Sequence, residues 1–354
     1  MRPGGSAILG GMRRLVTVLA LLAACSDSSE PALSKATSLG CPRPGALPFR
    51  LASSGFKKSI NKTIASEEPR NKDEASDTLG NPGGKIASIF LPDDQQPSAA
   101  PVTYHGIKAR TAPDSGLLAD QLGGENVSLW SYDPELAAWQ PIATTRTGDD
   151  GTYDLADTGF VAPNGRPIYA MLDADGSCAV HYDFLLPPGS KVVVTDIDGT
   201  LTLSDNELFM QFTDDKYVPV MMASADRLMQ AWATKGYPIV YLTARQHLLR
   251  PESRGWLADL GFPAGPLITA VGGEQADVYK TLWMKRMIQD FGWQVVAAYG
   301  NAVTDITAYA NASVPLDRTF IVGPEAGTGG TVAIPNMDFA QHITDFVNAQ
   351  PANP

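Results

Sequence analysis

The sequence predicts an α/β domain built on a parallel sheet, preceded by an all-β domain. Two patterns lead to this prediction. From about residue 190 onward, strand-like apolar runs alternate with helix-like runs, as in a parallel sheet covered by helices on both faces. Between residues 85 and 188, short strand-like runs are separated by turns rich in Gly and Asp. We therefore expect a β domain at 85–188 and a parallel-sheet domain at 189–350.

Composition limits the classes of function. The chain has 354 residues, of which 44% are hydrophobic and 18% charged. This composition is typical of a globular protein, and the length is sufficient for two domains. Its formal net charge of −11 gives no general attraction for nucleic acid or anionic membranes. No nucleic-acid partner is expected, and an anionic substrate would need a local basic site or a metal ion.

The N-terminus has the pattern of an export signal. Arg13 and Arg14 precede an apolar run at 15–24, which is short enough for a signal-peptide core. The run ends in Leu22-Ala23-Ala24-Cys25, which resembles the lipobox of bacterial lipoproteins. That resemblance implies that residues 1–25 are a signal peptide and that Cys25 becomes a membrane-anchoring lipidated residue. The protein would then be exported and held at the outer membrane, facing the periplasm or the cell exterior. A plain signal peptide with an incidental Cys is the alternative.

Residues 26–84 are expected to be a mostly disordered tether, because Ser, Pro, Lys, Glu and Asn dominate and apolar periodicity is weak. Besides Cys25, the chain contains Cys41 and Cys178. An exported location permits a disulfide between them, but the sequence leaves this pairing open.

The β domain is expected to have regularly spaced short strands. They are predicted at Ile86–Leu91, Val127–Tyr132, Trp139–Thr144, Thr152–Leu155, Ile168–Leu172 and Ala179–Leu185. Such spacing suggests a sandwich of immunoglobulin or transthyretin type.

Five strands and five helices are predicted in the second domain. Strands are predicted at 191–196, 238–243, 266–269, 295–300 and 319–322. Helices are predicted near 220–235, 251–260, 277–291, 303–311 and 338–348.

Two carboxylates follow the first of these strands. The apolar run 192–194 leads into Asp196 and Asp198, and Gly199 lets the chain turn sharply away from the sheet. Ligands of open α/β sheets bind at the carboxyl ends of strands. Paired acids there suit a hard cation such as Mg²⁺, and also a division of labour between a nucleophile and a proton carrier.

Residues from three further segments of the chain would complete a phosphoryl-transfer site. The Thr243 hydroxyl can hold a phosphoryl oxygen and Arg245 can orient one, both at the end of a predicted strand. Lys280 can offset the crowded negative charge. Asn301 and Asp305 follow another strand and offer oxygen ligands.

These motifs resemble those of the haloacid-dehalogenase superfamily, and more closely the lipin-like (LNS2) phosphatidate phosphatases. The domain is shared with phosphatidylinositol-transfer proteins of the retinal-degeneration-B type. The matching segments are Thr195–Thr202 with Ser204-Asp205, Tyr241–Arg245, Ser253–Leu257, Gly265–Leu267, Tyr279-Lys280, and Ala297–Asn301 with Asp305. The sequence departs from the lipin pattern at 246–252 and at 302–304.

The resemblance implies a role for each candidate residue. Asp196 would form an aspartyl-phosphate, and Asp198 would carry the proton. Thr243 and Lys280 would complete the catalytic set, while Arg245, Thr200 and Gly199 would bind the substrate. Mg²⁺ would be held by Asp196, Asp198, Asn301 and Asp305. Arg254 is expected to support the fold by pairing with a carboxylate.

The resulting hypothesis is a Mg²⁺-dependent phosphatidate phosphatase that works through an aspartyl-phosphate. Two alternatives remain open: a phosphatase of soluble exported monoesters, and a non-enzymatic phosphatidate-binding or lipid-transfer module. None of the four His residues pairs with another ligand at zinc spacing.

Overall fold

A computed structural model of the chain describes residues 41–42, 71–90, 98–99, 104–111, 119–133, 135–155, 167–173, 176, 178–213, 217–270 and 275–353. The expected signal peptide, the Cys25 anchor and most of the expected tether lie outside the described residues. No helix within the described ranges combines the length and the apolar character needed to cross a bilayer.

A six-stranded parallel sheet organises the C-terminal domain. Its strands are β12 (Lys191–Thr195), β13 (Ile239–Gln246), β14 (Leu267–Ala270), β15 (Gln294–Gly300), β16 (Thr319–Val322) and β17 (Val332–Ile334). They lie in the order β14-β13-β12-β15-β16-β17, and every neighbouring pair is parallel. This confirms the five predicted strands and the parallel sheet. The three-residue strand β17, at the sheet edge, was not predicted.

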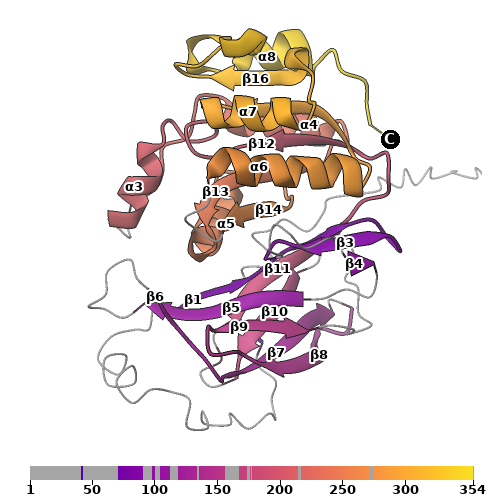
Figure 1. Cartoon of the computed structure of the whole chain (residues 1–354), viewed down its shortest axis with the longest axis vertical. Helices are drawn as coiled ribbons and strands as arrows, with labels where there is room; N and C mark the ends of the chain where they lie inside the picture. The colour runs from indigo at the N-terminus through magenta and orange to yellow at the C-terminus, as the bar shows by residue number, and fades with distance from the viewer. Residues whose placement is uncertain are drawn as a thin grey trace, which may run out of the picture. The chain divides into compact units, whose positions relative to one another are not determined.

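Helices cover both faces of this sheet because successive strand residues point to opposite sides. In β12, Val192 and Val194 pack in one apolar cluster with residues of α6 (Ala276–Lys285) and α7 (Val303–Asn311). Val193 packs on the other side, in a cluster with residues of α4 (Ala225–Thr234). Figure 1 shows α6 and α7 side by side.

Three further α-helices belong to the C-terminal domain. They are α3 (Asn206–Thr213), α5 (Arg250–Asp259) and α8 (Ala340–His342). Wider π-helical turns at Arg286–Asp290 and Ile343–Val347 extend α6 and α8. Helix α3 was not predicted.

The N-terminal part of the described chain forms two β sheets. One contains β1 (Asn71–Ala75), β5 (Tyr104–Thr111), β6 (Ala119–Gln121) and β9 (Thr152–Leu155). The other contains β2 (Thr78–Gly80), β3 (Lys85–Ser88), β4 (Ser98–Ala99), β7 (Asn126–Asp133), β8 (Ala138–Arg146), β10 (Pro167–Leu172) and β11 (Cys178–Leu185). Strands β1 and β2 fall within the segment expected to be tether, so the β domain begins before the expected boundary at residue 85.

The two sheets share one apolar core. Tyr104 and Tyr153 from the first sheet pack in the same cluster as Leu129, Ile168 and Ala179 from the second. All strand pairs of the two sheets are antiparallel except β2–β11, which is parallel. A likeness to immunoglobulin or transthyretin domains remains a prediction.

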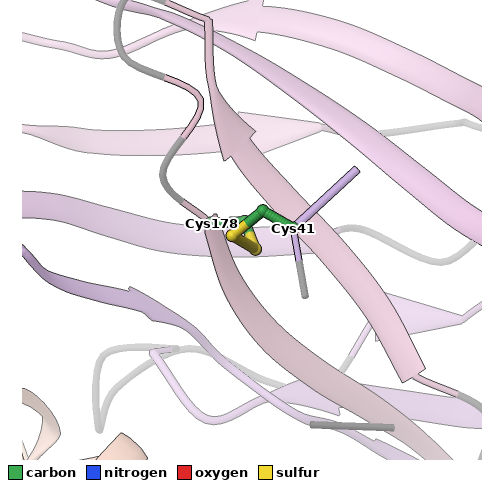
Figure 2. Close-up of a disulfide and its surroundings, with 2 residues drawn as sticks. All are labelled: Cys41 and Cys178. Carbon is green, nitrogen blue, oxygen red and sulfur yellow. A yellow bond between two sulfur atoms is a disulfide. The ribbon is translucent and has the colours of Figure 1, made fainter. Parts of the chain in front are cut away.

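A disulfide joins Cys41 to Cys178, 137 residues later at the start of β11 (Figure 2). The sequence had left this pairing open. The bond attaches a residue of the expected tether to the second β sheet.

The β domain and the parallel-sheet domain share buried contacts. Leu79 and Phe184 from the β domain belong to the same apolar cluster as Val192 and Trp293 from the parallel-sheet domain. Within this junction, the fully buried Asp77 pairs with Arg250 and Arg254. The expected pairing of Arg254 with a carboxylate is thus confirmed, and its contribution to stability stays a prediction.

Candidate active site

The candidate site lies where the strand order reverses. From β12 the chain first adds β13 and β14 on one side, and later adds β15, β16 and β17 on the other. Open α/β sheets bind ligands at the carboxyl ends of the strands beside such a reversal. Asp196 follows β12, Thr243 lies near the end of β13, and Asn301 follows β15. The topology therefore brings these three predicted residues to one edge of the sheet.

Asp196 is a buried carboxylate with a cation beside it. Its side chain is 5% exposed, and its Oδ1 atom lies 2.7 Å from the Nζ atom of Lys280. The Thr200 hydroxyl lies 3.4 Å from its Oδ2 atom. Burial raises the pKa of Asp196 to about 7, and the positive charge of Lys280 opposes this rise. Lys280 is therefore the group that favours the ionised, nucleophilic form of Asp196.

Lys280 also contacts Asp305, which was expected to be a metal ligand. The Nζ atom lies 2.7 Å from both Asp196 Oδ1 and Asp305 Oδ1. Burial lowers the pKa of Lys280, but the two carboxylates outweigh burial and raise it overall. The Oδ2 atom of Asp305 accepts hydrogen bonds from the backbone N–H groups of Asn301 and Ala302. Both oxygens of this fully buried residue are thus engaged: it caps α7 and holds Lys280, and its role as a metal ligand stays a prediction.

The turn after Asp198 brings Asn301 and Asp205 together. Gly199 has a φ of +67°, and a β-carbon at this position would collide with the Asn301 amide and crowd the Asp205 carboxylate. The Asn301 Nδ2 atom donates to Asp205 Oδ1 at 3.2 Å. Sequence reasoning missed Asp205 as a site residue, although it belongs to a stretch that matches the lipin pattern.

Gly199 and Thr200 were expected to bind substrate, but both are engaged with the protein in this structure. The Gly199 N–H donates to the Thr202 hydroxyl at 3.0 Å. The fully buried Thr200 hydroxyl lies within 3.4 Å of Asp196 and donates to Asn301 Oδ1 at 3.3 Å. Gly199 therefore allows the turn, and Thr200 links the candidate nucleophile to Asn301.

Asp198 and Arg245 form an ion pair. Arg245 Nε lies 3.1 Å and 3.0 Å from the two carboxylate oxygens of Asp198, and Nη2 lies 2.8 Å from Oδ1. The Thr243 hydroxyl lies 3.5 Å from Asp198 Oδ2. The sequence predicted Arg245 as a substrate ligand, but its side chain is 0% exposed and faces a protein carboxylate. The expected proton carrier is therefore already held by a protein cation.

The segment 203–220, which the structure describes at 203–213 and 217–220, follows the turn after Asp198. Gln211 of α3 accepts a hydrogen bond from Arg245 Nη1 at 3.2 Å, so α3 contacts the site. The buried Glu207 carboxylate accepts from the Tyr217 hydroxyl at 2.6 Å and from the Val220 N–H at 2.7 Å. Large apolar side chains of this segment are exposed at 203, 209, 210, 218 and 220.

The donors at the site are hard oxygen atoms, which suit Mg²⁺. Asp196 and Asn301 approach each other through the Thr200 hydroxyl, and Asp205 lies beside the Asn301 amide. Among the described residues of the site, four carboxylates (Asp196, Asp198, Asp205 and Asp305) gather with two cations, Lys280 and Arg245. A divalent cation would offset the excess negative charge that an incoming phosphate meets. In the part of the chain that the structure describes, no three His, Cys, Asp or Glu side chains form a ready metal cluster.

Comparisons with known proteins show what this domain is similar to. Residues 193–323 match the family model described as "PITM 1-3, LNS2 domain". The protein named retinal degeneration B, from Drosophila melanogaster, is 30% identical over 207 residues, which cover 57% of this chain and 16% of the relative. Human membrane-associated phosphatidylinositol transfer protein 3 is 28% identical over 206 residues, or 57% of this chain and 20% of the relative. The expected resemblance to LNS2 domains is confirmed for this segment.

The matched region is a fifth or less of the length of these relatives. It is longer than the parallel-sheet domain, so it also includes part of the β domain. Among solved structures, a D,D-heptose 1.7-bisphosphate phosphatase from B. bronchiseptica is 14% identical, with a TM-score of 0.32 over 44% of this chain and 98% of that chain. A phosphoserine phosphatase in apo form is 13% identical, with a TM-score of 0.32 over the same shares. Similarity at this level carries no argument about activity.

Proposed function

We propose that the parallel-sheet domain hydrolyses a phosphomonoester through an aspartyl-phosphate, with Asp196 as nucleophile and Asp198 as proton carrier. The observation that carries this proposal is the contact between Lys280 and Asp196 at 2.7 Å, with a second carboxylate two residues away at the same strand end. The cation beside Asp196 favours its ionised form, in which a carboxylate oxygen can attack phosphorus, while Asp198 contacts a different cation, Arg245.

The reaction has two steps. In the first, a carboxylate oxygen of Asp196 attacks phosphorus, and the bond from phosphorus to the ester oxygen breaks. Asp198 gives a proton to the leaving alkoxide, which departs as an alcohol. In the second, water attacks the aspartyl-phosphate while Asp198 takes one of its protons. Inorganic phosphate leaves, Asp196 is again a carboxylate, and Asp198 is again the protonated acid with which the first step began.

Mg²⁺ is the cofactor of this proposal. Asp196 and Asn301 would hold it, together with the backbone carbonyl of Asp198 and with Asp205 nearby. When bound, Mg²⁺ neutralises charge on the transferring phosphoryl group and aligns it with the nucleophile. Lys280 contributes charge at the same carboxylate and is itself held by Asp305.

Phosphatidate is the substrate we favour, on two grounds. One is that the motifs around Asp196 and Asp198, which lie within the LNS2 match over residues 193–323, resemble those of the lipin-like phosphatidate phosphatases. The other is the exposed apolar set on the segment 203–220, where Phe209 is 64% and Val218 is 67% exposed. Apolar side chains beside a phosphate-handling site suit an amphiphilic substrate better than a small, fully polar one.

A lipid-binding or lipid-transfer module is the second candidate. It is favoured by the names of the relatives, which are phosphatidylinositol transfer proteins. Binding alone does not require both Asp196 and Asp198, so the retained pair favours catalysis. A phosphatase of soluble exported monoesters is the third candidate.

Location at a membrane is also part of the proposal. Lipidation of Cys25 would anchor the exported protein to a bacterial outer membrane, where a tether raises the effective concentration of the domain near lipid. The disulfide between Cys41 and Cys178 supports export, because such bonds persist in oxidising compartments.

The deciding experiment measures phosphate release by the purified protein with Mg²⁺. Phosphatidate in mixed micelles and soluble monoesters are compared in parallel, and Asp196→Asn serves as the inactive control. Release from phosphatidate that greatly exceeds release from soluble monoesters supports the proposal. Release from soluble monoesters alone favours the third candidate. Phosphatidate binding without any phosphate release favours the binding module.

A further inference from the structure

The guanidinium group of Arg245 is held by protein groups on every side. Nε and Nη2 bind the Asp198 carboxylate at 2.8–3.1 Å. Nη1 donates to Gln211 Oε1 at 3.2 Å and to Ser253 Oγ at 3.0 Å. Each of the three nitrogens thus has a partner, and the side chain is 0% exposed.

This arrangement fixes the direction of Asp198. A two-pronged contact between a guanidinium and a carboxylate constrains both distance and plane, which a single hydrogen bond does not. The partners of Arg245 come from three separate elements: the turn after β12, helix α3 and helix α5. Since Asp198 is 14% exposed while Arg245 is covered, the cation holds the carboxylate from the protein side. To contact a phosphate, Arg245 would have to leave Asp198.

We propose that Arg245 is a positioning residue that holds Asp198 for proton transfer, and that Gln211 makes this position depend on helix α3. The inference rests on the proposed phosphatase function and deepens it. Gln211 of α3 and Ser253 of α5 accept hydrogen bonds from the guanidinium. A displacement of α3 would therefore shift Arg245, and with it the Asp198 carboxylate that Arg245 binds. Proton transfer is sensitive to such placement, because the donor must lie within hydrogen-bond reach of the leaving oxygen.

The test separates positioning from phosphate binding by varying the leaving group. The value of kcat/KM reports the first irreversible step, in which the ester bond breaks. An alkyl monoester needs a proton at that step, whereas p-nitrophenyl phosphate releases a stable phenolate. We expect Arg245→Ala to lower kcat/KM about 10²-fold for glycerol phosphate and only a few-fold for p-nitrophenyl phosphate. Inhibition by inorganic phosphate should stay near the wild-type level, because a ground-state phosphate contact is not being removed.

A double variant gives a second, independent readout. If Arg245 acts through Asp198, then Arg245→Ala combined with Asp198→Asn should be no slower than Asp198→Asn alone. Gln211→Ala and Ser253→Ala should show the same dependence on leaving group in weaker form. Gln230→Ala, which removes an exposed amide of α4, is the matched control. It should leave kcat/KM unchanged for both substrates.

Each outcome decides the inference. Equal losses for both substrates, with weaker inhibition by phosphate or additive effects in the double variant, would show that Arg245 is a phosphate ligand. If Arg245→Ala does not fold, the Gln211 and Ser253 variants test the inference through the same comparison of leaving groups. A wild-type protein that hydrolyses neither monoester nor phosphatidate overturns the proposed function, and this inference with it. If the wild type is active but its variants lose kcat/KM equally for glycerol phosphate and p-nitrophenyl phosphate, the inference is overturned and the proposed function stands.

Discussion

Asp77 in the β domain and Arg250 at the start of α5 lie 2.7 Å apart, and both are buried. Asp77 also pairs with Arg254 and accepts hydrogen bonds from the backbone N–H groups of Tyr182 and Leu267, at 3.0 Å and 3.1 Å. One carboxylate therefore joins residues from both domains. The junction makes the β domain a fixed support for the helix that supplies Ser253 to the candidate site.

Removal of the Asp77 carboxylate should destabilise the protein strongly. Asp77→Ala leaves Arg250 and Arg254 buried without their counter-charge, so we expect the free energy of unfolding to fall by about 3–5 kcal/mol. Lys85→Ala is the matched control, because Lys85 pairs with Asp290 across the same two domains at 3.5 Å and its side chain is 52% exposed. That exposed pair should contribute less than about 1 kcal/mol. Chemical unfolding measures the free energy of unfolding of both variants. Similar decreases in Asp77→Ala and Lys85→Ala would refute the structural role of Asp77.

The Cys41–Cys178 bond should stabilise the β domain by restricting the unfolded chain. In the chain-entropy picture, a closed loop of this length contributes at most about 5 kcal/mol. Cys41→Ser should therefore lower the melting temperature of oxidised protein, and a reductant should lower that of the wild type to a similar value. Cys25→Ser is the control and should melt like the wild type. A wild-type melting temperature unaffected by reductant would contradict this prediction.

Loss of the nucleophile should abolish hydrolysis without loss of the fold. Asp196→Asn removes the group that attacks phosphorus, and we expect the rate to fall by several orders of magnitude. Lys280 keeps its contact with Asp305 at 2.7 Å, so the circular-dichroism spectrum should remain that of the wild type. Asp226→Asn, in the first turn of α4, is the control and should remain active. More than a tenth of the wild-type rate in Asp196→Asn would exclude Asp196 as nucleophile.

Hydrolysis should depend on a divalent cation. Excess EDTA should stop phosphate release, and added Mg²⁺ should restore it, because the oxygen donors around Asp196 and Asn301 suit a hard cation. Mg²⁺ should also raise the melting temperature, since a ligand that binds only the folded state stabilises it. Asn301→Ala should weaken that thermal shift. Full turnover in EDTA, or a thermal shift unchanged in Asn301→Ala, would argue against this metal site.

Stability should fall in mild acid because of buried histidines. Burial lowers the pKa of His181 to about 3, against about 6.5 in the unfolded chain. Between these values the unfolded state binds a proton that the folded state does not, so the free energy of unfolding decreases as pH falls below 6.5. Burial lowers the pKa values of His247 and His342 as well, which adds to the effect. Urea unfolding at several pH values should show that the free energy of unfolding changes less with pH in His181→Phe than in the wild type.

Local patterns in the sequence predicted the secondary structure of the parallel-sheet domain well. Strand and helix periodicities are short-range properties, and the five predicted strands appear in a sheet whose strands are all parallel. The strand end that carries Asp196 and Asp198 was predicted for the same reason, because the apolar run before it is continuous. Short or edge elements such as β1, β2 and β17 were missed, since a few residues hold too little periodicity to stand out.

By itself the sequence determined that a strand ends in two carboxylates. It also determined that Thr243, Lys280 and Asn301 follow along the chain in the order that suits phosphoryl transfer. Only the tertiary structure decided which groups are partners. It paired Arg245 with Asp198, 47 residues earlier, and Arg250 with Asp77, 173 residues earlier. It also engaged both oxygens of Asp305. The type of a side chain shows which interactions it can make. The choice among them depends on which opposite charge the fold brings within reach and how far both groups are removed from water.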